Sequence, residues 1–306
     1  MKRTVVLGGT GFVGRHVCAR LSELGHPVLA VSRTPRPGAA IRSAALDLTA
    51  SGPGPLAELL RAERAEVVVN AAGGVWNSDE DQMRKSNADL TGSLVEALAG
   101  LPWRPRLVHL GSAHEYGAVP HGSIVDESWP PEPLTAYGRT KLAATEQVLA
   151  AVRAGRLDAI VLRVSNVLGP GAPAASLTGA VARQLAGDRD GRAVVRLSPL
   201  RAHRDFVAAQ DVAEAVALAA GTRCTGLVNI GSGTAVDVAG VVRRLVELSG
   251  VPAEVVFESR PPTAVRAVGD WQCLDISAAR ERLGWIPRRD LDSALADTWA
   301  AVAPVS

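Results

Sequence analysis

Gly8-Gly9-Thr10-Gly11-Phe12-Val13-Gly14 is the most informative stretch of this sequence. It lies between an apolar run at 3–7, a predicted strand, and an amphipathic stretch at 12–24, a predicted helix. Glycines at this spacing allow a tight turn, close approach of the backbone to a pyrophosphate and close packing of helix against strand. The helix N-terminus offers unpaired N–H groups to phosphates. We therefore expect a dinucleotide to bind at Gly8, Thr10, Gly11, Phe12, Val13 and Gly14.

Short β-branched runs alternate with amphipathic segments through the first two-thirds of the chain. The runs predict strands at 3–7, 27–31, 66–70, 106–111, 159–164 and 226–230, and the segments between them predict helices near 12–24, 55–63, 83–99 and 138–153. Apolar strands that alternate with helices are typical of a parallel sheet covered on both faces. The predicted fold class is α/β, a doubly wound parallel (Rossmann) sheet.

The alternation ends near residue 165. Pro and Gly cluster at 169–173, and we expect a loop-rich region to about 205 and an irregular stretch at roughly 250–290. These pieces predict a smaller C-terminal substrate-binding lobe over the carboxyl edge of the sheet, where such folds bind ligands. The expected division is 1–165 and 206–232 for the dinucleotide-binding domain, and 166–205 and 233–306 for the lobe.

Composition excludes several classes of protein. A net charge of +2 over 306 residues, without a dense basic run, argues against a nucleic-acid partner. No apolar run is long enough to span a bilayer, and glycines interrupt the apolar start, so we expect no membrane segment or signal peptide. Three scattered cysteines favour a reducing cytoplasm, and the six histidines show no ligand spacing for a metal.

The second predicted strand is followed by Ser32 and Arg33, and residues 27–46 contain no Asp or Glu. An NAD-specific site places an acidic residue here to accept hydrogen bonds from the ribose 2′-hydroxyl. Arg33 and Ser32 instead suit a 2′-phosphate. Although Arg33 has an alternative interpretation as a solvated loop charge, the missing acid favours NADP(H) as the cofactor.

Tyr137 and Lys141 stand four residues apart, on one face of a predicted helix. An ammonium beside a phenol favours the phenolate, so we expect Lys141 to lower the pKa of Tyr137 and to make it a general acid/base. About 25 residues before this pair, Ser112 ends the fourth predicted strand. Only two tyrosines and three lysines occur in the chain, so chance placement in these motifs is improbable.

Together these motifs resemble the extended short-chain dehydrogenase/reductase family, which includes nucleotide-sugar epimerases, dehydratases and reductases. The resemblance covers nearly the whole chain. Asp47-Leu48 resembles the segment with the adenine-contacting Asp, Asn70-Ala71-Ala72-Gly73 the loop after strand four, and Asn87 the start of the helix beside the catalytic one. The stretches 162–171, 203–207 and 283–287 resemble later family motifs.

The resemblance implies a role for each matching residue. Ser112 would hydrogen-bond the substrate oxygen, Tyr137 would exchange the proton, and Lys141 would hold the nicotinamide ribose. Asn166 and Arg204 would contact a sugar nucleotide, Arg204 at its diphosphate. Each of these two also has an ordinary structural alternative. The implied cofactor-contacting residues are Ser32, Arg33, Asp47, Leu48, Ala71, Ala72 and Lys141, and the substrate-contacting residues are Ser112, Ala113, His114, Tyr137, Asn166, Arg204 and Arg266.

Departures from the family pattern indicate the branch. Dehydratases carry Asp and Glu where this chain has Ala113 and His114, and alanine has no proton to give a leaving group. An NADP-type pocket favours net reduction, so we expect NADPH-dependent reduction of a keto group on a nucleotide-diphosphate sugar, foremost a dTDP-4-keto-6-deoxyhexose. The alternatives are a nucleotide-sugar epimerase, an NADPH-dependent reductase of a non-nucleotide ketone or aldehyde, and a non-catalytic NADP sensor on the same fold, which the retained Tyr137 and Lys141 disfavour. Family resemblance and symmetry rules favour a homodimer through helices 83–99 and 138–153.

Overall fold

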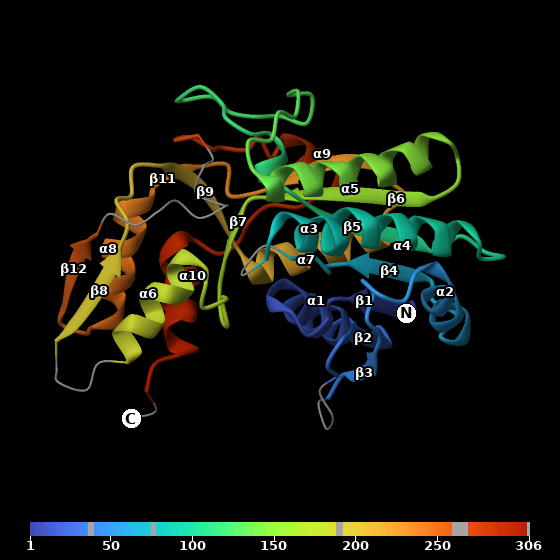
Figure 1. The fold of residues 1–306 in the computed structure, drawn as a ribbon, viewed down its shortest axis with the longest axis horizontal. Coiled ribbons are helices and arrows are strands. Elements are labelled where there is room, and N and C mark those ends of the chain that lie inside the picture. The colour runs from blue at the N-terminus through green and yellow to red at the C-terminus, as the bar shows by residue number, and fades with distance from the viewer. Residues whose placement is uncertain (36–39, 75–77, 188–191, 259–268, 305–306) are drawn as a thin grey trace.

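A computed structural model describes the chain except residues 36–39, 75–77, 188–191, 259–268 and 305–306. Its centre is a parallel sheet of seven strands in the order β10-β6-β5-β4-β1-β2-β3 (Figure 1). Every neighbouring pair in this sheet is parallel. The strands are β1 (Thr4–Leu7), β2 (Val28–Ser32), β3 (Arg42–Ala45), β4 (Val67–Asn70), β5 (Arg106–Ser112), β6 (Asp158–Val164) and β10 (Gly226–Ile230).

Helices cover both faces of this sheet, as a doubly wound fold requires. Successive strand residues point to opposite faces, so Val6 joins one buried cluster while Val5 and Leu7 join the other. The first cluster packs against α1 (Phe12–Glu23), α7 (Ala209–Gly221) and α9 (Ser277–Leu283). The second packs against α2 (Pro53–Ala62), α4 (Leu90–Ala99) and α5 (Ala136–Arg153). The predicted fold class is confirmed.

A second group of elements has a buried cluster of its own, beside the sheet (Figure 1). It contains a three-stranded sheet in the order β11-β9-β7 and the parallel pair β12-β8. Its elements are β7 (Asn166–Leu168), α6 (Leu177–Ala186), β8 (Ala193–Leu197), β9 (His203–Ala208), β11 (Ala235–Asp237), α8 (Val238–Ser249), β12 (Ala253–Phe257) and α10 (Leu291–Ala300). Although the sequence analysis assigns 233–306 to the smaller lobe, Ala279, Leu283 and Trp285 are buried in the first cluster of the central sheet.

The loop-rich prediction for 165–205 is wrong in part, because α6 and β8 lie there. The predicted irregular stretch at 250–290 likewise contains β12 and α9. These elements are short, so neighbouring Pro and Gly dominate the sequence pattern. Strand β8 shows its alternation only in the structure, where Ala193, Val195 and Leu197 are buried and the residues between them are exposed. Edge strand β3 was missed because it carries exposed Arg42 and little apolar sequence.

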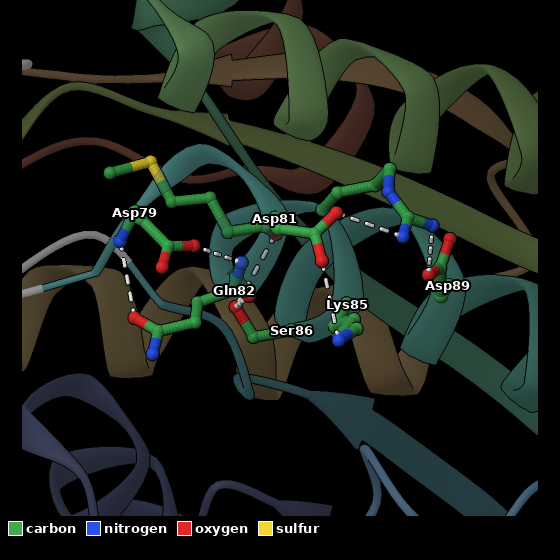
Figure 2. Close-up of polar contacts among 8 residues, drawn as sticks. Asp79, Asp81, Gln82, Lys85, Ser86 and Asp89 are labelled. Carbon is green, nitrogen blue, oxygen red and sulfur yellow. Dashed lines mark hydrogen bonds and ion pairs between the residues drawn. The ribbon is translucent and has the colours of Figure 1, made fainter.

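The predicted helix 83–99 begins three residues earlier and changes geometry partway. It starts as α3 (Glu80–Arg84), passes through a π-helical turn η1 (Lys85–Asp89) and continues as α4. Asp79 caps the start by accepting from the Gln82 backbone, while the Gln82 side chain accepts from the Asp79 backbone (Figure 2). A π turn often marks a functional position, and this one carries buried Asn87. Within the described residues, no helix combines the length and apolar character needed to cross a membrane.

Candidate active site

The order in which the chain adds strands reverses between β1 and β4, and the turns that follow these two strands meet there. The chain runs outward from β1 to β2 and β3 on one side, and from β4 to β5, β6 and β10 on the other. Ligands of such sheets bind in the crevice at this switch point. Gly8 adopts φ +73°, and a Cβ at this position would lie 2.8 Å from the carbonyl oxygen of Ala71. The first glycine is therefore required both for the turn and for the contact with the loop after β4.

The remaining glycines keep the N-terminus of α1 open and close to the turn. Gly11 is the N-cap of α1 and, because glycine has no side chain, it cannot cap the first N–H groups. A Cβ on Gly14 would clash with the Gly8 carbonyl, so only glycine lets the helix pack here. Uncapped N–H groups at a glycine-lined helix N-terminus fit the pyrophosphate of a dinucleotide. Thr10, Phe12 and Val13 belong to this same turn and first helical turn.

The residues that are expected to contact the adenosine part of the cofactor lie at the carboxyl ends of β2 and β3. The Ser32 hydroxyl donates to the Thr34 carbonyl oxygen, and Arg33 is exposed. Asp47 is exposed and accepts from the Thr49 backbone and hydroxyl, hydrogen bonds that lower its pKa, with a further contribution from the charge of Arg33. Leu48 is buried in the second core cluster. Arg33 and Asp47 therefore lie near each other beyond the strand ends.

Ser112, Tyr137 and Lys141 line one cavity together with the loop after β4. Ser112 is the last residue of β5, whereas Tyr137 and Lys141 lie in the first two turns of α5. The cavity wall also includes Val13 of α1, so it continues the crevice at the switch point. Its other lining residues are Ala71, Ala72, Gly73, Gly74, Asn87, Leu110, Gly111, Val164, Ser165, Val167 and Val212. Residues from seven separate segments of the sequence thus meet beside the glycine-rich turn.

The pKa of Tyr137 is raised, whereas the sequence analysis expects Lys141 to lower it. Burial raises the pKa of its phenol to about 12, a hydrogen bond with Ser112 acts in the opposite direction, and the charge of Glu115 raises it further. Lys141 is buried and donates from Nζ to the Leu110 carbonyl oxygen. Burial lowers the pKa of Lys141, and the charge of Glu115 raises it. The predicted depression of the Tyr137 pKa by Lys141 is therefore absent here, because desolvation dominates and the ammonium is directed to a backbone carbonyl.

His114 connects this cavity with the residues that the sequence predicts to contact the substrate. It lies in the short 3₁₀ turn η2 (Ala113–Glu115), and its ring packs edge-on against Tyr137 with centroids 5.5 Å apart. Burial lowers the pKa of His114 to about 4, the charge of Arg204 lowers it further, and a hydrogen bond with Asn166 opposes both. Its Nδ1 atom is buried without a hydrogen-bond partner. The imidazole is therefore neutral at physiological pH.

Asn166 and Arg204 lie in neighbouring strands β7 and β9 of the second group. The Asn166 amide donates to the Asp205 carbonyl and to the Gln272 side chain, and these two hydrogen bonds hold the amide in place. Arg204 is partly buried, and burial lowers its pKa while the charge of Asp270 opposes the shift. Arg266 lies outside the described residues. The structure thus brings His114, Asn166 and Arg204 together beside Tyr137.

Sequence reasoning missed a buried ion pair behind Ser112. Glu115 and Arg163 are both buried, and their side chains lie 2.8 Å apart. The available signal was Arg163 itself, a single charge within the apolar run 159–164, because a buried charge needs a partner. Asn87, expected only to begin a helix, donates to Gly74 and Thr140 and so joins the loop after β4 to α5.

A dinucleotide crevice followed by a Ser, Tyr and Lys cavity defines an α/β protein of the nicotinamide-dependent dehydrogenase class. The model of the NAD dependent epimerase/dehydratase family matches residues 4–231. The chain belongs to this family and has the fold of an extended short-chain dehydrogenase/reductase.

Named relatives act on nucleotide sugars. The chain is 45% identical over 313 residues to a dTDP-6-deoxy-L-talose 4-dehydrogenase (NAD(P)(+)) from Kitasatospora kifunensis, covering 99% of this chain and 97% of the relative. It is 29% identical to a UDP-glucose 4-epimerase from Azospirillum brasilense, covering 94% and 88%. The solved structure of MoeE5 with UDP-glucuronic acid and NAD is 28% identical with a TM-score of 0.84, covering 97% and 98%. These findings support an enzyme that modifies nucleotide sugars with a nicotinamide cofactor.

Proposed function

We propose that this enzyme uses NADPH to reduce a 4-keto group on a dTDP-linked 6-deoxyhexose. The observation that carries the proposal is the 45% identity, over nearly the full length of both chains, to a dTDP-6-deoxy-L-talose 4-dehydrogenase. A 4-dehydrogenase runs as a 4-ketoreductase in the reverse direction, since the same atoms are exchanged. The cavity with Ser112, Tyr137 and Lys141 contains the groups that this chemistry needs.

Each catalytic side chain has one task in this proposal. NADPH, when bound, supplies a hydride to the carbonyl carbon. Tyr137 donates its phenolic proton to the carbonyl oxygen, which becomes the alcohol. A phenol with a pKa of about 12 is protonated at neutral pH and is ready to act as the acid. Ser112 orients the same oxygen with a hydrogen bond, and Lys141, placed by its hydrogen bond to the Leu110 carbonyl, would hold the cofactor ribose.

The second group of elements, with its own buried cluster, serves in this proposal as the substrate-binding lobe. Arg204 would pair with the diphosphate, and a guanidinium is well suited to bidentate contacts with phosphate oxygens. Asn166 and His114 lie between Arg204 and Tyr137, where the sugar would sit. Ala113, beside Ser112, has no acidic proton, which argues against elimination of water.

We infer NADP(H) rather than NAD(H) from the carboxyl end of β2. Exposed Arg33 would pair with a 2′-phosphate, and the Ser32 hydroxyl would exchange its hydrogen bond to the Thr34 carbonyl for one to the phosphate. Asp47, the nearby acid, is held by Thr49. The double change Ser32→Asp and Arg33→Ala should move the preference from NADPH towards NADH, measured as the ratio of kcat/KM values. A wild type that prefers NADH, with a ratio unchanged by the double variant, would refute the assignment.

Epimerisation is the second candidate, because UDP-glucose 4-epimerases are among the relatives. An epimerase returns its cofactor to the starting state in each cycle, whereas a reductase consumes one NADPH for each alcohol formed. The discriminating experiment incubates the enzyme with dTDP- and UDP-sugars, with their 4-keto derivatives, and with ketones and aldehydes that lack a nucleotide. Stoichiometric NADPH oxidation with a dTDP-4-keto sugar supports the proposal, and inversion of a sugar without net oxidation supports an epimerase.

We also propose that the protein is a homodimer and that it lies in the cytoplasm. The free thiols of Cys18, Cys224 and Cys273 are in keeping with a reducing compartment. The proposed two-fold interface uses the outer faces of α4 and α5, which keep Glu96 and Glu146 exposed. Light scattering at micromolar concentration should give twice the chain mass of 31.8 kDa, and a monomer would refute the dimer.

A further inference from the structure

The buried carboxylate of Glu115 lies directly behind the catalytic residues and has four donors. Its Oε1 atom accepts from the Ser112 backbone N–H at 2.7 Å and from the Thr145 hydroxyl at 3.0 Å. Its Oε2 atom accepts from Arg163 Nε at 2.9 Å and Nη2 at 2.8 Å. Exposure of Glu115 is 0% and of Arg163 2%. An ion pair so enclosed requires good geometry, because both charges have lost their hydration.

This carboxylate packs against the last three residues of β5. A Cβ on Gly111 would lie 2.8 Å from Glu115 Oε1, so the strand passes closely over it. On one side of Gly111, the Leu110 carbonyl accepts from Lys141. On the other side, Ser112 hydrogen-bonds Tyr137. The segment that Glu115 supports therefore contacts both functional groups of α5.

The ion pair is itself held in place by further buried groups. The Arg163 guanidinium stacks over the Tyr116 ring, 4.2 Å from its centroid. The Tyr116 hydroxyl donates to Asn229 of β10 at 2.8 Å. The network thus links β5, β6 and β10 beneath the cavity. The charged side chains of Glu115 and Arg163 therefore have little freedom to move.

We propose that Glu115 is a positioning residue: paired with Arg163, it fixes the end of β5 so that Ser112 and the Leu110 carbonyl hold Tyr137 and Lys141 in their reactive arrangement. The inference deepens the proposed function and rests on it for the reaction, although the contacts themselves do not depend on the substrate. Glu115 also places a negative charge beneath Tyr137, which favours the protonated phenol that reduction requires.

Other ionisable groups lie around the cavity near Tyr137 or next to its neighbours, and each enters the interpretation of the Tyr137 titration. These groups are His114 of η2, Lys141 of α5, Glu115 with its partner Arg163 of β6, Arg204 of β9 beyond His114, and His109 of β5 near Lys141. Among them, Glu115 is the charge that acts on the Tyr137 phenol, and it raises the pKa. Removal of this charge therefore lowers the pKa of Tyr137.

The test changes Glu115 to Gln, which keeps the shape and removes the charge. Because the chain has only two tyrosines, ¹³Cζ-tyrosine labelling gives two signals, and Tyr116→Phe assigns them. In Glu115→Gln the Tyr137 signal should begin to titrate at lower pH than in the wild type. The kcat should fall by about 10²-fold, the cost of misplacing reacting groups by about 1 Å, while the KM for NADPH changes little.

Asp158→Asn is the matched control. It breaks the Arg106–Asp158 pair, which joins the same two strands at their opposite ends. It should lower the melting temperature without changing kcat or the Tyr137 titration. If Glu115→Gln does not fold because Arg163 is left unpaired, Glu115→Gln with Arg163→Gln removes both charges and should show the same two effects.

A folded Glu115→Gln enzyme with kcat within twofold of wild type and an unchanged Tyr137 titration would overturn the inference. The titration needs no substrate, which separates the two proposals. A shifted Tyr137 titration in a protein that reduces no nucleotide sugar supports the positioning role and refutes the proposed function. An unchanged titration in a protein that does reduce the dTDP-4-keto sugar refutes the positioning role alone.

Discussion

At the scale of single residues, burial controls the chemistry of the site. It raises the pKa of Tyr137 to about 12, lowers that of His114 to about 4 and lowers that of Lys141. In each case desolvation disfavours the charged form. The site therefore presents a phenol and a neutral imidazole to its substrate at physiological pH, an arrangement suited to proton donation.

Replacing Tyr137 with Phe keeps the ring and removes the proton. We expect kcat to fall by about 10²–10⁴-fold, the usual contribution of a general acid, while NADPH still binds. Steady-state kinetics and cofactor titration by fluorescence provide the measurement. Asp158→Asn is the control, since it breaks an ion pair at the far ends of β5 and β6 and should leave kcat within a few fold. Near-normal turnover in Tyr137→Phe would show that another group donates the proton.

At the scale of elements, the sequence predicts the central sheet better than the second group. The strands 3–7 and 66–70 match β1 and β4 to within one residue, because buried parallel strands read as nearly continuous apolar runs. The smaller group is built from strands of three to six residues that are only partly buried, and in β8 buried and exposed positions alternate. Edge strand β3 is partly polar, so its pairing with β2 depends on tertiary context that a single sequence does not contain.

In the candidate site, too, some features can be predicted from the sequence and others cannot. The glycine turn and the Tyr137–Lys141 pair depend on local spacing, so the sequence predicts where they lie, and the structure places both beside one cavity. The Glu115–Arg163 pair joins residues 48 positions apart, and nothing local marks it except a charge in an apolar strand. Desolvation at Tyr137 likewise depends on what covers the ring, which is why its pKa moves opposite to the expectation.

The π turn η1 joins two elements through Asn87, and this predicts an effect on stability. Asn87 donates to the Gly74 carbonyl and the Thr140 hydroxyl, and it accepts from the Gly74 N–H. Asn87→Ala leaves these groups unpaired at a buried position, so we expect a loss of about 2–4 kcal/mol in the free energy of unfolding. Urea denaturation measures the change. The control Ser86→Ala, one residue away, should cost less than about 1 kcal/mol, and equal costs would contradict this role for Asn87.

At the scale of the whole molecule, histidines that are buried or half-buried link the stability of the fold to pH. His114 has a pKa of about 4 in the folded chain and an ordinary value of 6.5. The unfolded state therefore binds more protons between these values, so folding stability decreases as pH falls below about 6.5 and this contribution is lost below 4. Burial lowers the pKa of His109 and His16 as well, which acts in the same direction.

Thermal unfolding at several pH values tests this linkage. From pH 7 to pH 4.5, the His114 contribution should amount to on the order of 2 kcal/mol of lost stability. The variant His114→Asn should therefore lose less melting temperature over this interval than the wild type. A parallel decrease in both proteins would mean that His114 does not titrate as its surroundings indicate.

The most direct test of the proposed reaction follows the hydride. The enzyme is incubated with a dTDP-4-keto-6-deoxyhexose and NADPH carrying deuterium at both positions of C4 of the nicotinamide, and the sugar product is analysed by NMR and mass spectrometry. The account predicts one deuterium at C4 of the sugar for each NADPH oxidised, and almost none with Tyr137→Phe over the same time. A product with no deuterium, or an inverted sugar formed without net NADPH oxidation, would contradict it.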